Sequence, residues 1–303
     1  MNMGLDKRMR RIAVVAVFLI LGIAGVFLIW HKNKEALRAE VRKIDPSKET
    51  DSKKLEDLAK RDPEAAARLA LQLPKGDALN NAVANVAYIW AGKSPEAAAK
   101  WAMQLTDDMA IQLANCNVAQ AWAGKSLKAA SKWAMQLPEG SARNSAICGI
   151  ALVRAQKDTE AAKKWVLQLP DGEARSTAIV TVSSLQAQKN PEDAANWVLQ
   201  LPDGTARNNA VSSVAYSWAC NSPELAAAWV LQLPDGTARN NAIFSVAQSW
   251  ANKSPENAEK WVLQLPDSNV RNNAISIVTV LLARKEESGN GKSDNVMPKP
   301  CRR

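Results

Sequence analysis

A repeat of fixed period governs what this chain can fold into. Seven copies of 32 residues follow one another without insertion or deletion, beginning at residues 63, 95, 127, 159, 191, 223 and 255 and ending at residue 286. Such self-similarity is typical of repeat proteins, in which each unit packs mainly against its neighbours. The repeat therefore predicts a tandem array, although 303 residues could otherwise hold two ordinary domains.

Each copy has the pattern of two amphipathic helices. In the sixth copy, Ser222 can cap a helix and Pro223 suits its first turn, and Pro234 ends that helix. Asp235 and Gly236 make a turn that can cap a second helix. Small and aromatic residues recur three and four positions apart, so that each helix presents an apolar stripe.

Tryptophan marks both stripes. It recurs in the first helix at Trp101, Trp133, Trp165, Trp197, Trp229 and Trp261, and in the second at Trp90, Trp122, Trp218 and Trp250. Two short helices cannot bury such stripes alone, whereas stacked neighbours remove them from water along a continuous core. We therefore predict an all-α fold, an α-solenoid of seven two-helix repeats over residues 63–286.

Four positions of the repeat are identical in all seven copies. They are the Ala series from Ala66 to Ala258, the Gln series from Gln72 to Gln264, the Leu series from Leu73 to Leu265, and the Ala series from Ala82 to Ala274. Ala allows helices to approach closely and Leu fills the core. Because buried amides are seldom unpaired, we expect the Gln series to bridge to turn backbone, with a ligand-binding role as the alternative.

The tandem hairpins resemble helical-repeat solenoids of the tetratricopeptide and HEAT classes over residues 63–286. The resemblance is one of architecture, because the period is 32 where tetratricopeptide repeats have about 34. The Trp, Leu-Gly and Tyr spacing of that family is also absent from the stretch that follows Trp229. The class implies a scaffold that binds protein partners, and no family's ligand residues are carried over.

The segments outside the array predict a membrane protein. Residues 1–11 form a basic tail, and residues 12–30 form an uncharged apolar run long enough for a helix to cross ~30 Å of hydrocarbon. We expect an uncleaved signal anchor of a bacterial inner membrane, with the repeats on the extracytoplasmic side. Residues 31–62 are predicted to be a charged stalk with a capping half-repeat, and residues 287–303 a disordered tail.

Charge and residue types argue against several functions. The net charge is +9, but residues 63–286 hold 21 basic against 19 acidic side chains, which disfavours a nucleic-acid groove. The one histidine, His31, adjoins the predicted membrane span, so that no Ser-His, Cys-His or multi-His arrangement is possible within the repeats. We predict no enzymatic activity, no cofactor and no metal site.

Two further residue types recur at equivalent positions. Acidic residues at the turns, Asp171, Asp203, Asp235 and Asp267, suit capping better than acid-base catalysis. Cys116 and Cys148 are also equivalent, and helix spacing predicts Cα atoms about 8 to 10 Å apart, beyond the ~7 Å that a disulfide bridges. These two cysteines are therefore expected to be buried thiols.

The candidate binding surface is a ladder near the start of the second helices. It comprises Arg143, Arg175, Arg207, Arg239 and Arg271, followed by Asn144, Asn208, Asn240 and Asn272. Guanidinium groups could bind the carboxylates of an acidic peptide, and amides the backbone of an extended one. Alternatively, each Arg pairs within the fold with the Asp four residues before it, a contact of about 0.2 to 0.5 kcal/mol.

Three functions are consistent with these features. The first is a membrane-anchored scaffold for protein or peptide partners, in contact with lipid only through residues 12–30. The second is a passive spacer, in which the polar groups of the Arg and Asn ladder all bond within the fold. The third is a carbohydrate-binding or enzymatic protein with an unfamiliar site, which requires a deep pocket with convergent polar groups. The sequence does not define the oligomeric state.

Overall fold

The described residues, 52–289 of the computed structural model, are folded into α-helices without a strand, which confirms the all-α prediction. The helices are α2 (Ser52–Arg61), α3 (Pro63–Ala70), α4 (Asp77–Lys93), α5 (Pro95–Ala102), α6 (Asp108–Lys125), α7 (Leu127–Gln136), α8 (Ser141–Lys157), α9 (Thr159–Leu167), α10 (Glu173–Lys189), α11 (Pro191–Leu199), α12 (Thr205–Asn221), α13 (Pro223–Gln232), α14 (Thr237–Lys253), α15 (Pro255–Leu263) and α16 (Asn269–Gly289).

The predicted tail 1–11 and membrane span 12–30 lie outside the described residues, as do residues 31–51 and the chain from residue 290. Between residues 52 and 289, none of the helices combines the length and apolar character needed to cross a membrane. The membrane anchor and the extracytoplasmic location therefore stay predictions.

Every copy of the repeat folds as a hairpin of a short helix followed by a long one. The short helices have 8 to 10 residues, and the long helices α8, α10, α12 and α14 have 17 each. Ahead of the first copy, α2 packs against α3 and buries Leu55 and Leu58. The described chain thus consists of repeated helical hairpins preceded by one helix.

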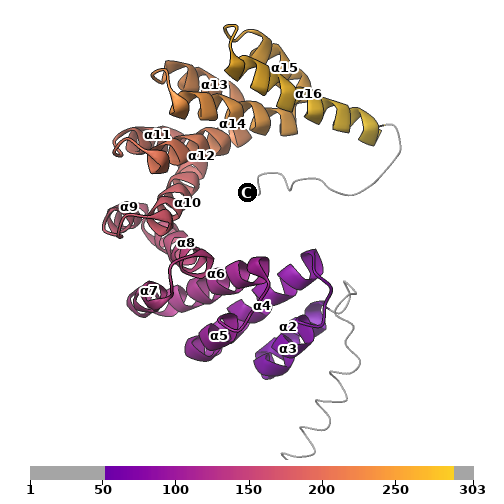
Figure 1. The fold of residues 1–303 in the computed structure, drawn as a ribbon, viewed down its shortest axis with the longest axis vertical. Helices are drawn as coiled ribbons and strands as arrows, with labels where there is room; N and C mark the ends of the chain where they lie inside the picture. The colour runs from indigo at the N-terminus through magenta and orange to yellow at the C-terminus, as the bar shows by residue number, and fades with distance from the viewer. Residues whose placement is uncertain (1–51, 290–303) are drawn as a thin grey trace, which may run out of the picture. The chain divides into compact units, whose positions relative to one another are not determined.

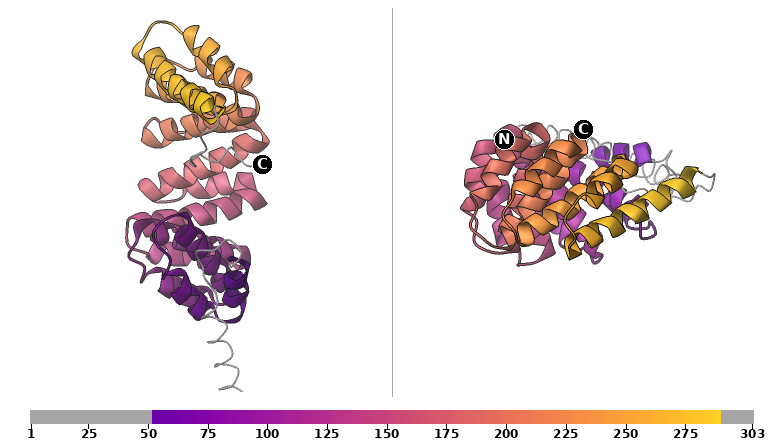
Figure 2. Two further views of the ribbon diagram at one scale, coloured as in Figure 1. Left: turned by 90° about the vertical axis from the view of Figure 1, so that its right-hand side faces the viewer. Right: turned by 90° about the horizontal axis from the view of Figure 1, so that it is seen from above.

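The chain divides into two compact units, one ending at Trp90 and the other beginning at Ala91. In the second unit, each long helix from α6 to α16 packs against the next long helix. Each short helix from α7 to α15 contacts the long helices before and after it. The long helices consequently form one side of this unit and the short helices the other (Figures 1 and 2).

The identical Ala and Leu positions form the core of the hairpins. The Ala residues of both series are buried, as Ala226 and Ala242 show with no exposed area. The Leu residues are also buried, except that Leu169 is partly exposed. Close helix packing around Ala and Leu is therefore confirmed for these positions.

Tryptophan pairs connect one copy to the next. The ring centroids lie 5.4 Å apart in Trp122–Trp133, 5.6 Å in Trp218–Trp229 and 5.7 Å in Trp250–Trp261. Each pair joins the long helix of one copy to the short helix of the following copy. Such pairs are worth about 0.5 to 1.5 kcal/mol beyond the burial of their area.

In the middle copies, cations contact the Trp side chains that lack an aromatic partner. Arg154 stands where other copies have the long-helix Trp, and its guanidinium lies 5.1 Å from the ring of Trp165. Lys163 Nζ lies 5.5 Å from the ring of Trp197. A cation over an indole face gives about 0.5 to 2 kcal/mol, so the contact between copies is kept by other chemistry.

Glycine sets the turn within most hairpins. Gly140, Gly172, Gly204 and Gly236 have φ between 127° and 149°, a conformation that strains other residues. Ser268 replaces Gly in the last copy, where its hydroxyl accepts from the backbone N–H of Arg271. The turn is thus stabilised by backbone freedom in most copies and by a side-chain cap in the second and the last, where Asp107 and Ser268 accept from backbone N–H groups.

Helix capping differs from the sequence prediction. Gly236, and not Asp235, is the N-cap of α14, because the Asp235 carboxylate pairs with Arg239 instead. Ser222 occupies the predicted N-cap position of α13, but its side chain makes no capping hydrogen bond. The carboxylates of Asp62 and Asp158 do accept from the backbone N–H three residues on. Proline after the serines stabilises those helix starts without a side-chain cap.

The long helices α6 and α8 approach each other closely at Gly149 of α8. A Cβ atom there would lie 2.4 Å from the carbonyl oxygen of Cys116 and 3.1 Å from the Cβ of Ala119, both in α6. Only a residue without a side chain allows the two backbones to touch in this way.

Replacing Gly149 with Ala should lower the free energy of unfolding by about 1 to 3 kcal/mol, since the added methyl group overpacks the contact between α6 and α8. Gly124→Ala is the matched control, because a Cβ there meets nothing within 4 Å and Ala favours the helix by up to about 1 kcal/mol. Urea unfolding followed by circular dichroism measures both. Equal effects of the two substitutions would contradict the close approach.

Trp218→Ala should lower the free energy of unfolding by about 3 to 5 kcal/mol, because it leaves a cavity and removes the partner of Trp229. Gln232→Ala, at an exposed position of the next short helix, should leave stability unchanged. The same urea titration distinguishes them. A Trp218→Ala protein that unfolds at the wild-type midpoint would show that the Trp pairs do not hold the copies together.

Candidate functional site

The Arg side chains of the ladder are paired within the fold. Arg143 contacts Glu139 at 3.3 Å and Arg271 contacts Asp267 at 3.8 Å, and the same pairing four residues apart is present in the three copies between them, in Arg175–Asp171, Arg207–Asp203 and Arg239–Asp235. Arg143 Nε also donates to the carbonyl oxygen of Leu137 at 2.8 Å. The internal pairing is thus confirmed in five copies.

The carboxylates of these pairs face the solvent more than the guanidinium groups do. The Asp235 side chain is 95% exposed and the Arg239 side chain 22%. The other four pairs show the same imbalance. The outer surface of the ladder therefore presents acidic groups, and an acidic peptide would meet like charge there.

The Asn residues of the ladder differ in their surroundings. Asn144 Nδ2 donates to Glu173 Oε2 at 2.7 Å, which links α8 to α10. The side chains of Asn208, Asn240 and Asn272 make no hydrogen bond within residues 52–289, and Asn240 and Asn272 are exposed. The structure therefore uses one of the four amides internally and leaves three with unused hydrogen-bonding capacity.

A groove of about 460 Å³ lies between α14 and α16, on the long-helix side of the second unit. Its lining residues are Asn240, Asn241, Phe244, Val270, Asn273, Ser276, Ile277 and Val280. Phe244 is 38% and Val280 49% exposed, so that apolar side chains face the solvent beside three amides. A mixture of apolar surface and a few polar groups is typical of ligand sites.

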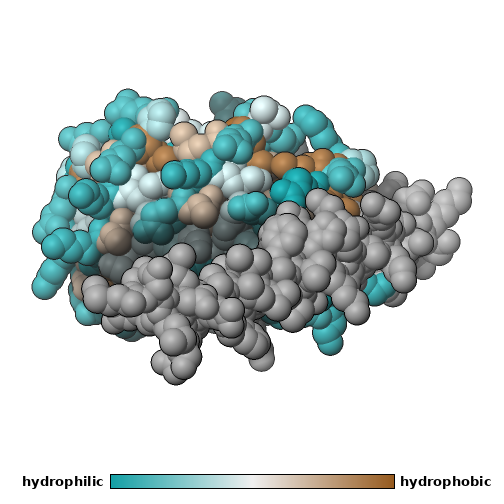
Figure 3. All heavy atoms as spheres, turned by 90° about the horizontal axis from the view of Figure 1, so that it is seen from below, coloured by the Kyte–Doolittle hydropathy of each residue, from teal (hydrophilic) through white to brown (hydrophobic). Residues whose placement is uncertain are grey.

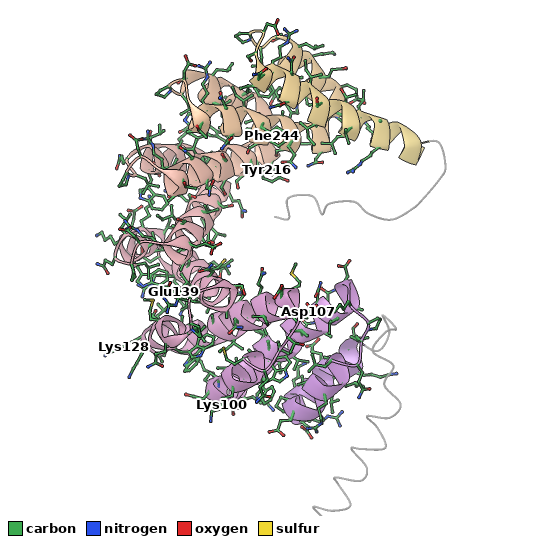
Figure 4. All side chains as sticks on the ribbon, in the orientation of Figure 1. Lys100, Asp107, Lys128, Glu139, Tyr216 and Phe244 are labelled. Carbon is green, nitrogen blue, oxygen red and sulfur yellow. The ribbon has the colours of Figure 1, made fainter. Side chains whose placement is uncertain are left out.

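The groove belongs to a face of the long helices on which the residue type changes from copy to copy. Phe244 has the equivalents Ala84, Cys116, Cys148, Val180, Ser212 and Ser276. Figure 4 shows Tyr216 of α12 and Phe244 of α14 on this side of the second unit, and Lys128 of α7 on the opposite side. Positions that hold the stack together are identical, whereas this face varies.

The Gln series is exposed, so the prediction that it bridges to turn backbone is wrong. All seven side chains are exposed, and none makes a hydrogen bond within the described residues. The residue before each Gln is Leu or Met, and six of these seven are 37% to 50% exposed. Sequence reasoning missed this apolar position because it follows core residues at the end of an amphipathic helix.

Exposed apolar side chains remain limited in extent. Figure 3 shows one face of the molecule, on which most coloured residues are hydrophilic and the apolar ones form narrow bands. Among residues 52–289 there is no group of three or more His, Cys, Asp or Glu side chains that could hold a metal ion. The groove between α14 and α16 therefore combines exposed apolar side chains with amides in one concave site.

Comparisons with models of protein families, with curated proteins and with solved structures found no match for this chain.

A double-mutant cycle on Asp235 and Arg239 should give a coupling energy of about 0.2 to 1 kcal/mol, because the pair is at the surface. The coupling should fall in 1 M salt, where the screening length is about 3 Å. Unfolding free energies of the wild type, Asp235→Ala, Arg239→Ala and the double variant provide the cycle. A salt-insensitive coupling above about 2 kcal/mol would contradict a surface pair.

Proposed function

We propose that the protein is an α-solenoid scaffold, anchored in a membrane by residues 12–30, that binds an extended segment of a partner protein along its long helices. The observation that carries this proposal is the groove between α14 and α16, where three unpaired amides adjoin exposed apolar side chains. The packing of successive long helices in the second unit supports the solenoid.

The spacing of the amides suits a peptide in the polyproline II conformation. Asn241 and Asn273 are equivalent residues of adjacent copies, so they are separated by about one helix-to-helix distance of 8 to 10 Å. A polyproline II chain rises about 3.1 Å per residue and repeats every three residues, which gives about 9.3 Å. One amide could thus pair with the peptide backbone at every third residue.

The apolar residues of the groove form the surface against which the apolar side chains of the peptide pack. Phe244 offers an aromatic surface, and Val280 widens the apolar patch on α16. Aromatic grooves bind polyproline II segments because these ligands lose little conformational entropy on binding. The Arg ladder has no direct part in this proposal, since its guanidinium groups are paired and its outer surface is acidic.

A passive spacer is the second candidate. Its specific support is the internal pairing of all five Arg side chains, together with the hydrogen bond between Asn144 and Glu173. A spacer gives no reason for the unpaired amides of Asn240, Asn241 and Asn273 beside an exposed Phe. The scaffold accounts for both observations.

Selection of a phage-displayed library of linear peptides on the detergent-solubilised full chain tests the scaffold. Selected peptides should share a motif that repeats every third residue. Phe244→Ala and Asn273→Ala should each weaken binding of a selected peptide about tenfold, which corresponds to about 1.4 kcal/mol. Isothermal titration calorimetry measures the affinities.

Lys128→Ala, on the short-helix side, is the matched control and should leave the affinity unchanged. A library that yields no binder, or binders equally tight to the wild type and Phe244→Ala, would overturn the proposed groove and favour the spacer. Circular dichroism of each variant establishes that the helices are intact.

A further inference from the structure

Cys116 and Cys148 bring two thiols together at equivalent positions of adjacent copies. Cys116 lies in α6 and Cys148 in α8, and both are free cysteines with partly exposed side chains. They lie on the variable face of the long helices, where other copies have Ser212 or Ser276. Two neighbouring copies therefore carry the same chemically reactive group at one place on the stack.

The close approach at Gly149 brings the backbones of α6 and α8 together beside these two cysteines. Gly149 follows Cys148 directly, and a Cβ atom added to it would lie 2.4 Å from the carbonyl oxygen of Cys116. The spacing of 8 to 10 Å expected from sequence thus does not apply between α6 and α8. Both cysteines are free, as expected, but they are only partly buried. Each thiol shifts the pKa of the other, which is the behaviour of neighbouring thiols.

Polar neighbours make the two sulfurs unequal. The hydrogen bond from the Cys116 thiol lowers the pKa of Cys148 against the opposing effect of burial, and the same contact raises the pKa of Cys116. Thr181 Oγ1 lies 3.3 Å from Cys148 Sγ, and Gln120 Nε2 donates to Cys116 Sγ at 3.2 Å. A thiolate beside a protonated thiol is the arrangement that thiol–disulfide exchange requires.

We propose that Cys116 and Cys148 form a dithiol that exchanges with a small external disulfide and closes into an intramolecular bond between the second and third copies. The Cys148 thiolate attacks one sulfur of the external disulfide, whose S–S bond breaks and releases one thiolate. Cys116 passes its proton to that thiolate and attacks Cys148 Sγ, which releases the second thiolate. Two protein thiols are oxidised and one disulfide is reduced to two thiols.

Partial burial favours a small disulfide over a folded protein as the oxidant. Both thiols are intermediate in exposure, so a compact reagent reaches them more easily than the surface of a protein does. Closure of the bond links α6 to α8 covalently beside Gly149. The reaction is independent of peptide binding at the groove between α14 and α16.

The test is to treat the reduced full chain with oxidised glutathione, to trap free thiols with an alkylating reagent, and to map the products after trypsin digestion. Cys116 lies in peptide 101–125 and Cys148 in peptide 144–154, so each product is resolved from those of the other cysteines. The expected main product is the disulfide that joins these two peptides.

Serine variants identify the role of each sulfur, and serine already occurs at this position in other copies. In the Cys116→Ser variant, the reaction should stop at a glutathione adduct on Cys148. Cys148→Ser should leave Cys116 reacting at least about tenfold more slowly than Cys148 does in the wild type. Circular dichroism confirms folding of both variants.

Two results would overturn the dithiol. One is a wild-type chain in which glutathione adducts accumulate on both cysteines without the cross-link. The other is a folded chain that resists glutathione disulfide at concentrations that oxidise it in urea, which is the behaviour of two inert buried thiols.

Discussion

The contact between neighbouring hairpins is the constraint on which the structure depends. A short and a long helix each carry an apolar stripe, and one hairpin has no surface of its own that covers both. In the second unit the stripes are buried because each long helix packs against the next and each short helix lies between two of them. The Trp pairs, such as Trp218 with Trp229, put the largest side chains at these junctions.

This constraint separates the residues that build the stack from those that are free to vary. Ala, Leu and Trp recur because every junction needs the same volumes at the same places. Where Arg154 stands in place of the long-helix Trp, it covers Trp165, so this junction tolerates a change of chemistry. The outward positions of the long helices have no such requirement, and they hold thiols in α6 and α8 but amides and Phe244 around α14.

Local features of this fold could be predicted from the sequence, and non-local ones could not. Helix limits follow from Pro223 and Pro234, and the pairing of Asp235 with Arg239 follows from helical spacing alone. The Gln series was expected to bond to the turn because a core Leu follows each Gln. At the end of the short helix, however, the Gln side chain points outward and is exposed. The groove depends on how α14 packs against α16, and the proximity of the two cysteines depends on how close α6 and α8 lie at Gly149.

The Trp pairs also mean that the repeat of the sequence and the repeat of the packing are out of phase. Sequence copies end between a long helix and the following short one, yet the rings of Trp250 and Trp261 meet across that border. The unit of packing defined by these Trp pairs is therefore a long helix together with the short helix that follows it. Natural end points for shortened versions of this protein lie at the glycine turns, such as Gly236, where no aromatic partner is left behind.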